Sequence, residues 1–379
     1  DPKIKDLLLD KNFDVDIKQV EYIIKSLDKF TILHHLMRVS PLPDLQYEKF
    51  FTKLRRFLLM HLDQFEETPV LINFLSTLSL HCFTNEYIYF QKKEETNLIK
   101  KLEAEISESI IKSEYPEIKK ILCLASYRPL HQYIWCQKLT VIDHLEDVKS
   151  RLIREPYEEK IISENIPLLK EISDEISCRV KVQYEKNPYP RWVKNGIPTK
   201  AKSISEICND LKLDLKSENI KKVTNPSILI AGCGTGQHSI ATASRFSNCQ
   251  VTAFDLSIAS LSYAKRKTIE LGITNLEYLQ ADILNLNQLE NKFDIIESVG
   301  VLHHMNNPTE GWKILSNLLK PGGLIKIGLY SKLARKHIVE IRKEIKLLKL
   351  GTTEDEIREF RKFLVKSYNK NYLLINNSI

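Results

Sequence analysis

The sequence lacks any apolar run of the roughly 18 residues that a membrane-spanning helix needs. Its seven cysteines are scattered and odd in number, and none stands in a C-x-x-C pair. This pattern disfavours both a disulfide framework and a zinc site, so no metal is expected. The opening residues, Asp1-Pro2-Lys3 and a charged amphipathic stretch, do not resemble a secretory signal peptide. We therefore expect a cytoplasmic protein with free thiols.

The sequence also lacks a strong excess of charge of one sign. The 379 residues carry a net charge of +7, from 56 basic and 49 acidic residues, in segments of mixed sign. The basic runs at 332–349 and 358–366 are interrupted by Glu340, Glu344 and Glu359. Solvated helix faces explain them better than an RNA-binding surface, so nucleic acid is not an expected partner. With 43% hydrophobic residues, a chain of this length predicts about two globular domains with ample core.

A glycine-rich turn is the most informative feature that is present. An apolar run, Ile228 to Ile230, is followed by glycines at 232, 234 and 236, and a helical pattern starts near His238. Strand, glycine turn and helix in this order form a cradle in which a ligand lies against bare backbone and a helix N-terminus.

The spacing of this turn argues against a dinucleotide. The G-x-G-x-x-G fingerprint would need Gly or Ala where Gln237 or Ser239 stands. A second strand, Gln250 to Phe254, ends in Asp255, 19 residues past Gly236. A carboxylate at this place suits the two hydroxyls of a ribose. The alternative is that Asp255 is a helix N-cap or turn residue.

Three further strands are predicted in register, at 275–279, 293–298 and 324–330. A helical segment at 312–319 precedes the last of them, with a sharp turn at 319–323. Strands separated by helices at this pace indicate an α/β fold with a doubly wound parallel sheet.

Five segments together carry a specific resemblance: ILIAGCGTG, VTAFDLS, LQADIL, FDIIESVGVLHHM and LLKPGGLIKIGLY. In order and spacing they resemble the motif series of class I S-adenosylmethionine-dependent methyltransferases. The resemblance covers about 225–330. It implies a Rossmann-like methyltransferase sheet there, S-adenosyl-L-methionine as cofactor, and methyltransferase activity.

The resemblance also implies the cofactor contacts. The three glycines would lie against the methionine end, Asp255 would hold the ribose, and Asp282 would approach the adenine. The full set of expected cofactor residues is Gly232, Cys233, Gly234, Gly236, Asp255, Leu256, Ala281, Asp282 and Val299. One departure is Ile230, which stands where the family usually has an acidic residue. Either a polar contact near the cofactor's ammonium is lost, or another residue takes over that role.

Catalytic candidates follow the fourth strand. Methyl transfer from a sulfonium is an in-line displacement, so alignment of the reactants dominates, and a base is needed only for a protonated nucleophile. The segment after this strand normally faces the methyl group, which nominates Glu297, His303 and His304. The alternative is that one histidine packs under the sheet and the other caps the next helix.

A second resemblance lies upstream, in QYEKNPYPRWV at 183–193, HCFTNEYIYF at 81–90 and LASYRPLHQY at 124–133. These segments are similar to bacterial methyltransferases with a helical, often tetratricopeptide-containing, N-terminal region. We expect Tyr184, Tyr189, Arg191 and Trp192 to form a lid over the cofactor or acceptor pocket. Two alternatives stay open: a rigid turn, or a displaced form of the Asn-Pro-Pro-Tyr loop of adenine and glutamine N-methyltransferases.

Before this segment the pattern is helical, at 17–39, 44–65, 69–92 and 94–113. No convincing 34-residue repeat is found, so residues 1–160 are predicted to form a helical array without a repeat family, able to recruit a partner or substrate. Residues 161–224 are expected to hold a connecting helix, part of a longer one at 156–176, the lid segment and a polar entry at 194–224. Residues 225–330 would form the Rossmann-like domain and 331–379 a set of C-terminal helices.

The predicted C-terminal part is unusual, because two helices, at 333–350 and 352–367, follow the fifth strand and only 371–376 (NYLLIN) could form another strand. A complete class I sheet would add two, so the chain looks truncated. Two functions remain open. One is a methyltransferase whose helical array recruits the acceptor, which could be a protein or peptide. The other is a non-catalytic scaffold with a degenerate methyltransferase fold.

Overall fold

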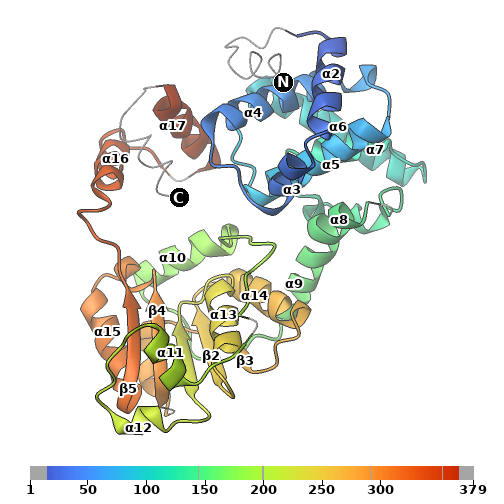
Figure 1. Cartoon of the computed structure of the whole chain (residues 1–379). Helices are drawn as coiled ribbons and strands as arrows, with labels where there is room; N and C mark the ends of the chain where they lie inside the picture. The colour runs from blue at the N-terminus through green and yellow to red at the C-terminus, as the bar shows by residue number, and fades with distance from the viewer. Residues whose placement is uncertain (1–14, 144, 199, 291, 352, 367–379) are drawn as a thin grey trace. The chain divides into compact units, whose positions relative to one another are not determined.

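The computed structural model describes residues 15–143, 145–198, 200–290, 292–351 and 353–366. Their contacts form two compact units: a helical unit, which combines the chain up to 156 with the chain from 332 onward, and an α/β unit of residues 157–331 (Figure 1). The C-terminal helices, expected to be a separate segment, therefore group with the N-terminal helices. No helix among the described residues is long and apolar enough to cross a bilayer.

The helical unit is built almost wholly of helices, as predicted. Its helices are α2 (Ile17–Asp28), α3 (Thr31–Val39), α4 (Leu45–Met60), η1 (Leu62–Gln64), α5 (Pro69–Thr84), α6 (Lys93–Ile111), α7 (Ile118–Ala125), η2 (Leu130–Gln132), η3 (Cys136–Lys138), α8 (Glu146–Lys149), η4 (Ser150–Arg154), α16 (Lys336–Leu347) and α17 (Glu354–Lys366). The helix expected at 17–39 is two helices, and the one expected at 69–92 ends at Thr84. Glu86 and Tyr87, with φ of 56° and 54°, cannot continue an α-helix.

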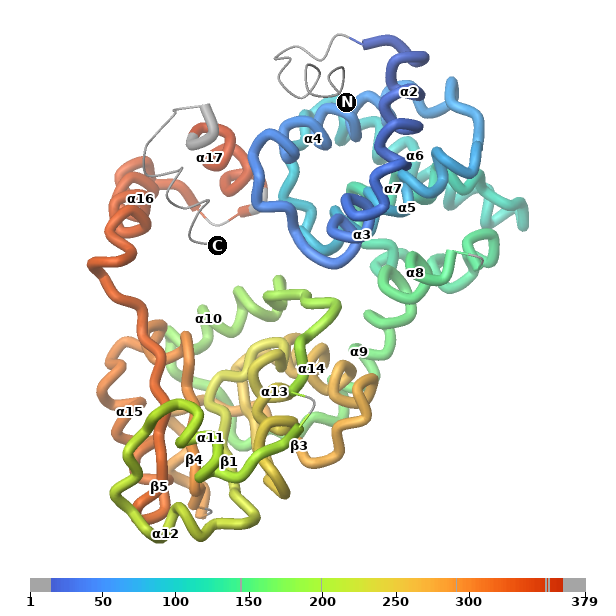
Figure 2. Tube along the Cα trace, viewed as in Figure 1, coloured from blue at the N-terminus to red at the C-terminus, as the bar shows by residue number. Residues whose placement is uncertain are grey.

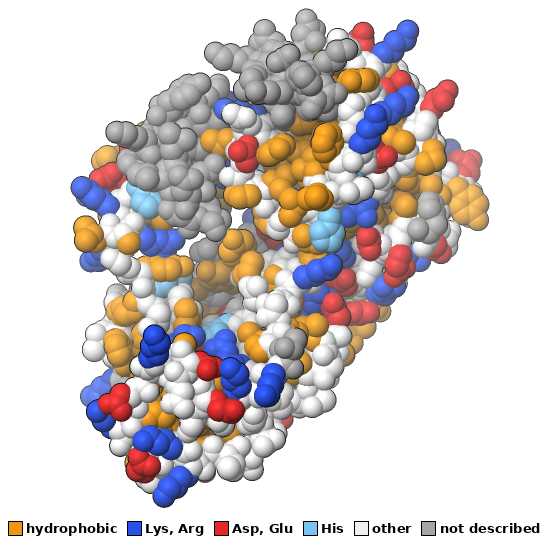
Figure 3. All heavy atoms as spheres, in the orientation of Figure 1, with side chains coloured by type: hydrophobic (Ala, Val, Ile, Leu, Met, Phe, Trp, Pro, Cys, Tyr) orange, Lys and Arg blue, Asp and Glu red, His pale blue; other side chains and the backbone are white. Residues whose placement is uncertain are grey.

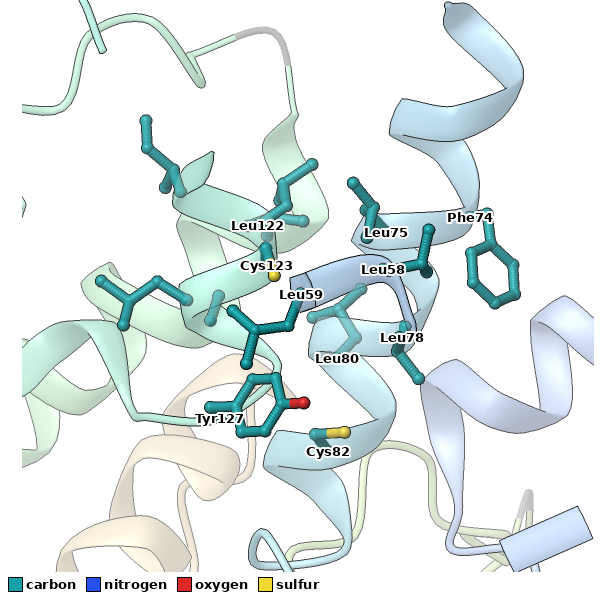
Figure 4. Packing of buried hydrophobic residues seen from close by; sticks show 14 of the residues in the cluster. Leu58, Leu59, Phe74, Leu75, Leu78, Leu80, Cys82, Leu122, Cys123 and Tyr127 are labelled. Carbon is teal, nitrogen blue, oxygen red and sulfur yellow. The ribbon is translucent and has the colours of Figure 1, made fainter. Parts of the chain in front are cut away.

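Helix α5 is the centre of this unit. Thr68 caps its N-terminus and Pro69 occupies the first turn, where a missing N–H costs nothing. Because α5 is apolar around almost its whole circumference, it is buried by α2, α3, α7 and α8. Figure 4 shows part of this core, to which α4 contributes Leu58, α5 contributes Leu78 and α7 contributes Leu122.

The C-terminal helices complete the helical unit. Figure 2 follows the chain from its blue beginning, through the α/β unit, to the red helices. The Arg361 guanidinium lies 2.6 Å from the Glu48 carboxylate, and Ile341 and Phe360 pack with Leu45. The expected strand at 371–376 lies outside the described residues.

The α/β unit contains one fully parallel sheet of order β3-β2-β1-β4-β5. Its strands are β1 (Ser227–Ala231), β2 (Gln250–Asp255), β3 (Leu276–Gln280), β4 (Phe293–Val299) and β5 (Leu319–Gly328). The helices are α10 (Glu175–Lys186), α11 (Ile204–Asp210), α12 (Glu218–Lys221), α13 (Gln237–Arg245), α14 (Ile258–Glu270), η5 (Ile283–Gln288), η6 (Leu302–His304) and α15 (Pro308–Asn317). Helix α9 (Glu155–Ser163) carries the chain into this unit.

Alternate residues of each strand serve opposite faces of the sheet. On β1, Ile228 and Ile230 join the core beneath α11, α13 and α14, whereas Leu229 and Ala231 join the core beneath α15. The strand order reverses between β1 and β4, so the chain winds outward in both directions from this point. A doubly wound sheet binds its ligand at the carboxyl ends of the strands beside such a reversal.

Three expectations about this unit are corrected. Strand β5 begins at Leu319, and the expected sharp turn is an irregularity inside it: Leu319 pairs with Phe293 and Leu324 with Ile295, so four residues of β5 oppose one residue of β4. The connecting helix expected at 156–176 ends at Ser163, and Pro167 prevents its continuation toward 176. There the Pro167 carbonyl accepts a hydrogen bond from the Gln280 N–H (2.8 Å) beside β3.

The third correction concerns the polar entry at 194–224. It contains the short helices α11 and α12, whose Ile204, Ile207, Cys208 and Ile220 are buried in the core of the sheet. The apolar residues of this mostly polar stretch are too few to show a helical periodicity in the sequence.

Candidate functional site

A cavity of about 340 Å³ lies at the carboxyl ends of β1, β2 and β4. It is lined by the glycine turn, by the ends of these strands, by η6 and by α10. Of the expected cofactor residues, those that line it are Gly232, Cys233, Gly234, Asp255, Leu256, Ala281, Asp282 and Val299. Gly236 does not; it is the N-cap of α13.

At two positions of the turn, 232 and 236, only glycine fits, and the neighbour that excludes a side chain differs between them. A Cβ on Gly232 would lie 2.4 Å from Val301 Cγ2, and one on Gly236 would lie 2.6 Å from Ala264 Cβ. Both residues have positive φ, of 76° and 86°. Glycine is therefore required both by sterics and by backbone conformation, and it brings the chain close to the cavity.

Asp255 ties the turn to the end of β2. Its Oδ2 accepts the Gly234 N–H (2.8 Å) and its Oδ1 accepts the Ser257 N–H (3.1 Å). Burial raises the pKa of Asp255, and these N–H donors partly offset the effect, while the Glu185 charge adds to it. Ser257, and not Asp255, caps α14 through the Ser260 N–H. Asp255 thus stabilises the turn, and because it also lines the cavity, its carboxylate can accept hydrogen bonds from a ligand.

Asp282 has a similar double role at the end of β3. Its Oδ1 accepts the Leu284 N–H (3.0 Å) and caps η5, and its side chain is buried on the wall of the cavity. The two carboxylates stand on adjacent strands, as the carboxyl edge of a parallel sheet requires.

The segment 184–193, which we call the clamp, corrects the expected lid. Tyr184 and Tyr189 line the cavity, but Arg191 and Trp192 do not. Trp192 is 7% exposed, and its Nε1–H donates to the Thr235 carbonyl of the glycine turn (2.9 Å).

Other bonds fasten the clamp as well. Thr235 Oγ1 donates to the Pro190 carbonyl (2.7 Å), and Glu185 accepts the Ile258 and Ala259 N–H groups at the start of α14 (2.8 and 2.9 Å). The Arg191 guanidinium lies 3.9 Å from Glu159. The clamp is therefore built as a brace for the glycine turn, and of its residues Tyr184, Tyr189 and Pro190 line the cavity.

The three catalytic candidates separate in the structure. His304 lines the cavity. His303 does not; its ring stacks on Tyr330, with centroids 3.9 Å apart, and on His304, at 4.3 Å. Glu297 is buried behind the cavity wall, where its Oε2 lies 2.6 Å from His238 Nε2 and accepts from Thr242 Oγ1 at 3.0 Å.

His238 is a cavity residue that the sequence pattern did not single out. It is the second residue of α13, directly after the glycine turn. Its position at the predicted helix start was the available signal, but its partner Glu297 is far away in the sequence.

The rest of the cavity wall is mostly aromatic and apolar. Ile176 and Val180 of α10 contribute, together with Tyr184, Met305 and Tyr330. Among the described residues that line the cavity there is no Lys or Arg. The wall thus has carboxylates at the ends of β2 and β3 and histidines near the glycine turn and η6.

Comparison with known proteins agrees with this geometry. Residues 228–323 match the family model of a methyltransferase domain. An uncharacterized protein of Synechococcus sp. is 35% identical over 124 residues, which are 32% of this chain and 30% of that protein. (S)-coclaurine N-methyltransferase of Papaver somniferum is 34% identical over 113 residues, 30% of this chain and 32% of that enzyme. The chain thus spans about a third of the length of these two relatives.

Ubiquinone biosynthesis O-methyltransferase of Leptothrix cholodnii is 28% identical over 151 residues, 38% of this chain and 63% of that enzyme. Among solved structures, coclaurine N-methyltransferase bound to N-methylheliamine and SAH is similar at 23% identity and a TM-score of 0.31, covering 46% of this chain and 52% of that one.

Proposed function

We propose that this chain transfers a methyl group from S-adenosyl-L-methionine to an acceptor, and the match of residues 228–323 to the family model of a methyltransferase domain supports this. The observation that carries the proposal is the convergence of the glycine turn, Asp255 and Asp282 on one cavity at the carboxyl edge of the sheet. The cavity residues fit the cofactor: bare backbone at Gly232 and Gly234, and an acceptor carboxylate for ribose hydroxyls at Asp255.

The cofactor supplies the electrophilic methyl group when it is bound. The chain's own contribution is alignment and exclusion of water, because an in-line displacement gains most from the position of the nucleophile. Ile176 and Val180 of α10, with Val301 and Met305 on either side of η6, give the cavity apolar walls that would help to exclude water. His304 is the cavity residue suited to accept a proton from an acceptor that arrives protonated.

We propose a protein or peptide as the acceptor, recruited by the helical unit. Large apolar side chains stand exposed on α2 and at α3: Tyr22 (45%), Phe30 (48%) and Ile32 (76%). Figure 3 shows hydrophobic side chains gathered on the visible face of the helical unit, with charges of both signs mixed around them. Exposed apolar groups of this kind mark surfaces that bind other proteins. The relatives' names instead point to smaller acceptors, which are the competing outcome.

Two measurements test the proposal. S-adenosylhomocysteine should raise the melting temperature of the intact chain, and NAD should not. Labelled methyl groups from S-adenosylmethionine should then enter the protein fraction of a cell extract. Label only in small molecules or RNA would refute the acceptor class. Stabilisation without any transfer would favour the non-catalytic scaffold, and no stabilisation by S-adenosylhomocysteine would reject the enzyme altogether.

A further inference from the structure

The structure pairs a histidine of the cavity wall with a buried carboxylate. His238 Nε2 lies 2.6 Å from Glu297 Oε2, and the two side chains are 27% and 5% exposed. His238 lines the cavity and Glu297 does not. Glu297 can therefore act on a ligand only through His238.

Glu297 occupies an unusual place in the sheet. Its register partners are Ile230 on β1 and Lys326 on β5, so all three side chains point to the α13 face of the sheet. The rest of this face is largely apolar, including Ile228 and Ile295. A carboxylate buried there is costly unless partners compensate its charge.

The partners of Glu297 hold it in the ionised form. Thr242 Oγ1 donates to Oε2 (3.0 Å), and Lys326 Nζ lies 3.8 Å from Oε1. Burial alone would raise the pKa of Glu297, but His238, Lys326 and Thr242 together lower it. The ring can offer an N–H to Glu297 and another to a ligand only in its doubly protonated form, and the Glu297 carboxylate, 2.6 Å from Nε2, supplies the charge opposite to that form. Since Nε2 faces Glu297, Nδ1 is the ring nitrogen left for a ligand.

The charges of the cavity limit what the free ring nitrogen of His238 can bind. Asp255 and Asp282 stand at the ends of β2 and β3, and Lys and Arg are absent from the described lining. The methionine end of the cofactor carries an α-carboxylate, which needs a donor or a positive charge. His238 follows the glycine turn and starts α13, whose free N–H groups also favour an anion.

We propose that His238, held by Glu297, binds the α-carboxylate of the methionine end of S-adenosylmethionine. The inference rests on the proposed function, since it assumes that this cofactor enters the cavity. His238 contributes one charge-assisted hydrogen bond to the carboxylate, and Glu297 is a positioning residue that fixes the orientation of the imidazole. A competing role for His238 is general base toward the acceptor, and that role would not depend on the amino-acid end of the cofactor.

The test compares two ligands by titration calorimetry on the full chain. S-adenosylhomocysteine carries the α-carboxylate, whereas 5′-methylthioadenosine has the same nucleoside and thioether without the amino-acid end. In His238→Ala we expect affinity for S-adenosylhomocysteine to fall about 10- to 100-fold. Affinity for 5′-methylthioadenosine should change by less than about twofold. Glu297→Gln should weaken the first ligand selectively but less. The double variant should be about as weak as His238→Ala, because the two residues act as a unit.

The outcomes separate the inference from the proposed function. If neither ligand binds the wild-type chain, the proposed function fails. If both ligands bind but lose affinity equally in a folded His238→Ala, the residue only supports the cavity wall and the inference is wrong. Unchanged binding of S-adenosylhomocysteine with lost methyl transfer would assign His238 as a base and would also overturn it. If Glu297→Gln does not fold, His238→Gln, which keeps a neutral donor, should show a smaller selective loss than His238→Ala.

Discussion

The two units both bury ionisable side chains, but they use them differently. In the helical unit, Arg55 is 2% exposed and donates to the carbonyls of Ser126 (3.0 Å) and Phe90 (3.2 Å), with its guanidinium 3.9 Å from the Tyr127 ring. Glu95, 1% exposed, accepts from Arg56 (2.9 Å) and from Tyr127 (2.8 Å). The hydrogen bonds of Arg55 and Glu95 thus go to other residues of the helical unit.

The α/β unit also encloses charged side chains, such as Arg266 and Lys267 of α14, but in addition it places ionisable groups beside the cavity at the carboxyl edge of the sheet. Asp255, Asp282 and His238 each bond to the chain on one side and face the cavity on the other. The difference teaches where to look for function. A buried charge enclosed by its own protein is a feature of stability, and a buried charge beside a cavity is a feature of binding.

The largest expected effect would come from removing the enclosed cation. Arg55→Ala leaves the carbonyls of Ser126 and Phe90 without a partner and opens a cavity, so we expect a loss of about 3–5 kcal/mol of unfolding free energy. Denaturant unfolding followed by circular dichroism measures it. Arg154→Ala, whose side chain is 51% exposed beside Glu146, is the control and should cost no more than about 0.5 kcal/mol. Similar losses in both variants would contradict the contrast.

A binding residue should show the opposite pattern. Asp255→Ala removes an acceptor for the ribose hydroxyls, and we expect S-adenosylhomocysteine affinity to weaken by about 1.5–3 kcal/mol. Calorimetric titration measures the affinity, and a circular dichroism spectrum confirms folding. Unchanged affinity in the folded variant would remove Asp255 from the ribose site.

Acid should act on the helical unit through an enclosed histidine. His81 is 1% exposed; its Nδ1 donates to the Met37 carbonyl (3.1 Å) and its Nε2 accepts from the Tyr89 hydroxyl (2.7 Å). Burial lowers the pKa of His81 to about 4, so the unfolded state binds the proton first. This residue's stabilisation is present above about pH 6.5 and is lost as the pH falls toward 4, by about 2 kcal/mol between pH 7 and pH 5.

Unfolding free energies at these two pH values measure the effect. Burial also lowers the pKa of His34, so part of the pH dependence will remain in His81→Gln. A pH dependence identical in wild type and His81→Gln would show that His81 does not carry the effect.

The smallest expected effect on stability comes from the clamp, where Trp192 and Tyr189 should respond differently to substitution. Trp192→Phe keeps an aromatic ring against Tyr263 but removes the hydrogen bond to Thr235, so we expect a stability loss of about 1 kcal/mol. Because the clamp braces the glycine turn, activity per folded molecule should change little. Tyr189→Ala, a cavity residue that is 56% exposed, should do the reverse. Melting temperature and transfer rate on one preparation distinguish the two; a rate loss in Trp192→Phe without loss of stability would restore the lid hypothesis.

Much of the α/β unit was predictable because its signals are local. Parallel strands buried on both faces are continuous apolar runs, and β1 to β4 appear within a residue of their expected bounds. The glycine turn and Asp255 were predictable since positive φ and close approach demand glycine at fixed spacing. Strand β5 was harder, because Pro321 and Gly322 signal a turn even when a strand absorbs it as an irregularity.

The rest depended on contacts between distant residues. His238 meets Glu297 only because β4 pairs with β1 and places Glu297 beside His238 and Thr242 of α13. The sequence also gives no sign that Trp192 is buried, because its partner Thr235 lies 43 residues further along the chain. The sequence pattern identified Glu297 as important, but it could not show that a neighbouring histidine stands between this carboxylate and the cavity.

The helical unit is made of two stretches of chain, with the whole α/β unit between them. Glu48 and Arg361 meet across 313 residues of sequence, whereas the α/β unit is continuous. During synthesis, which proceeds from the N-terminus, the α/β unit can fold as soon as it emerges from the ribosome. The N-terminal helices can bury their own core before α16 and α17 are synthesised, but the face around Leu45 stays uncovered until those two helices emerge. The order of translation thus makes the α/β unit a finished module before the helical unit is complete.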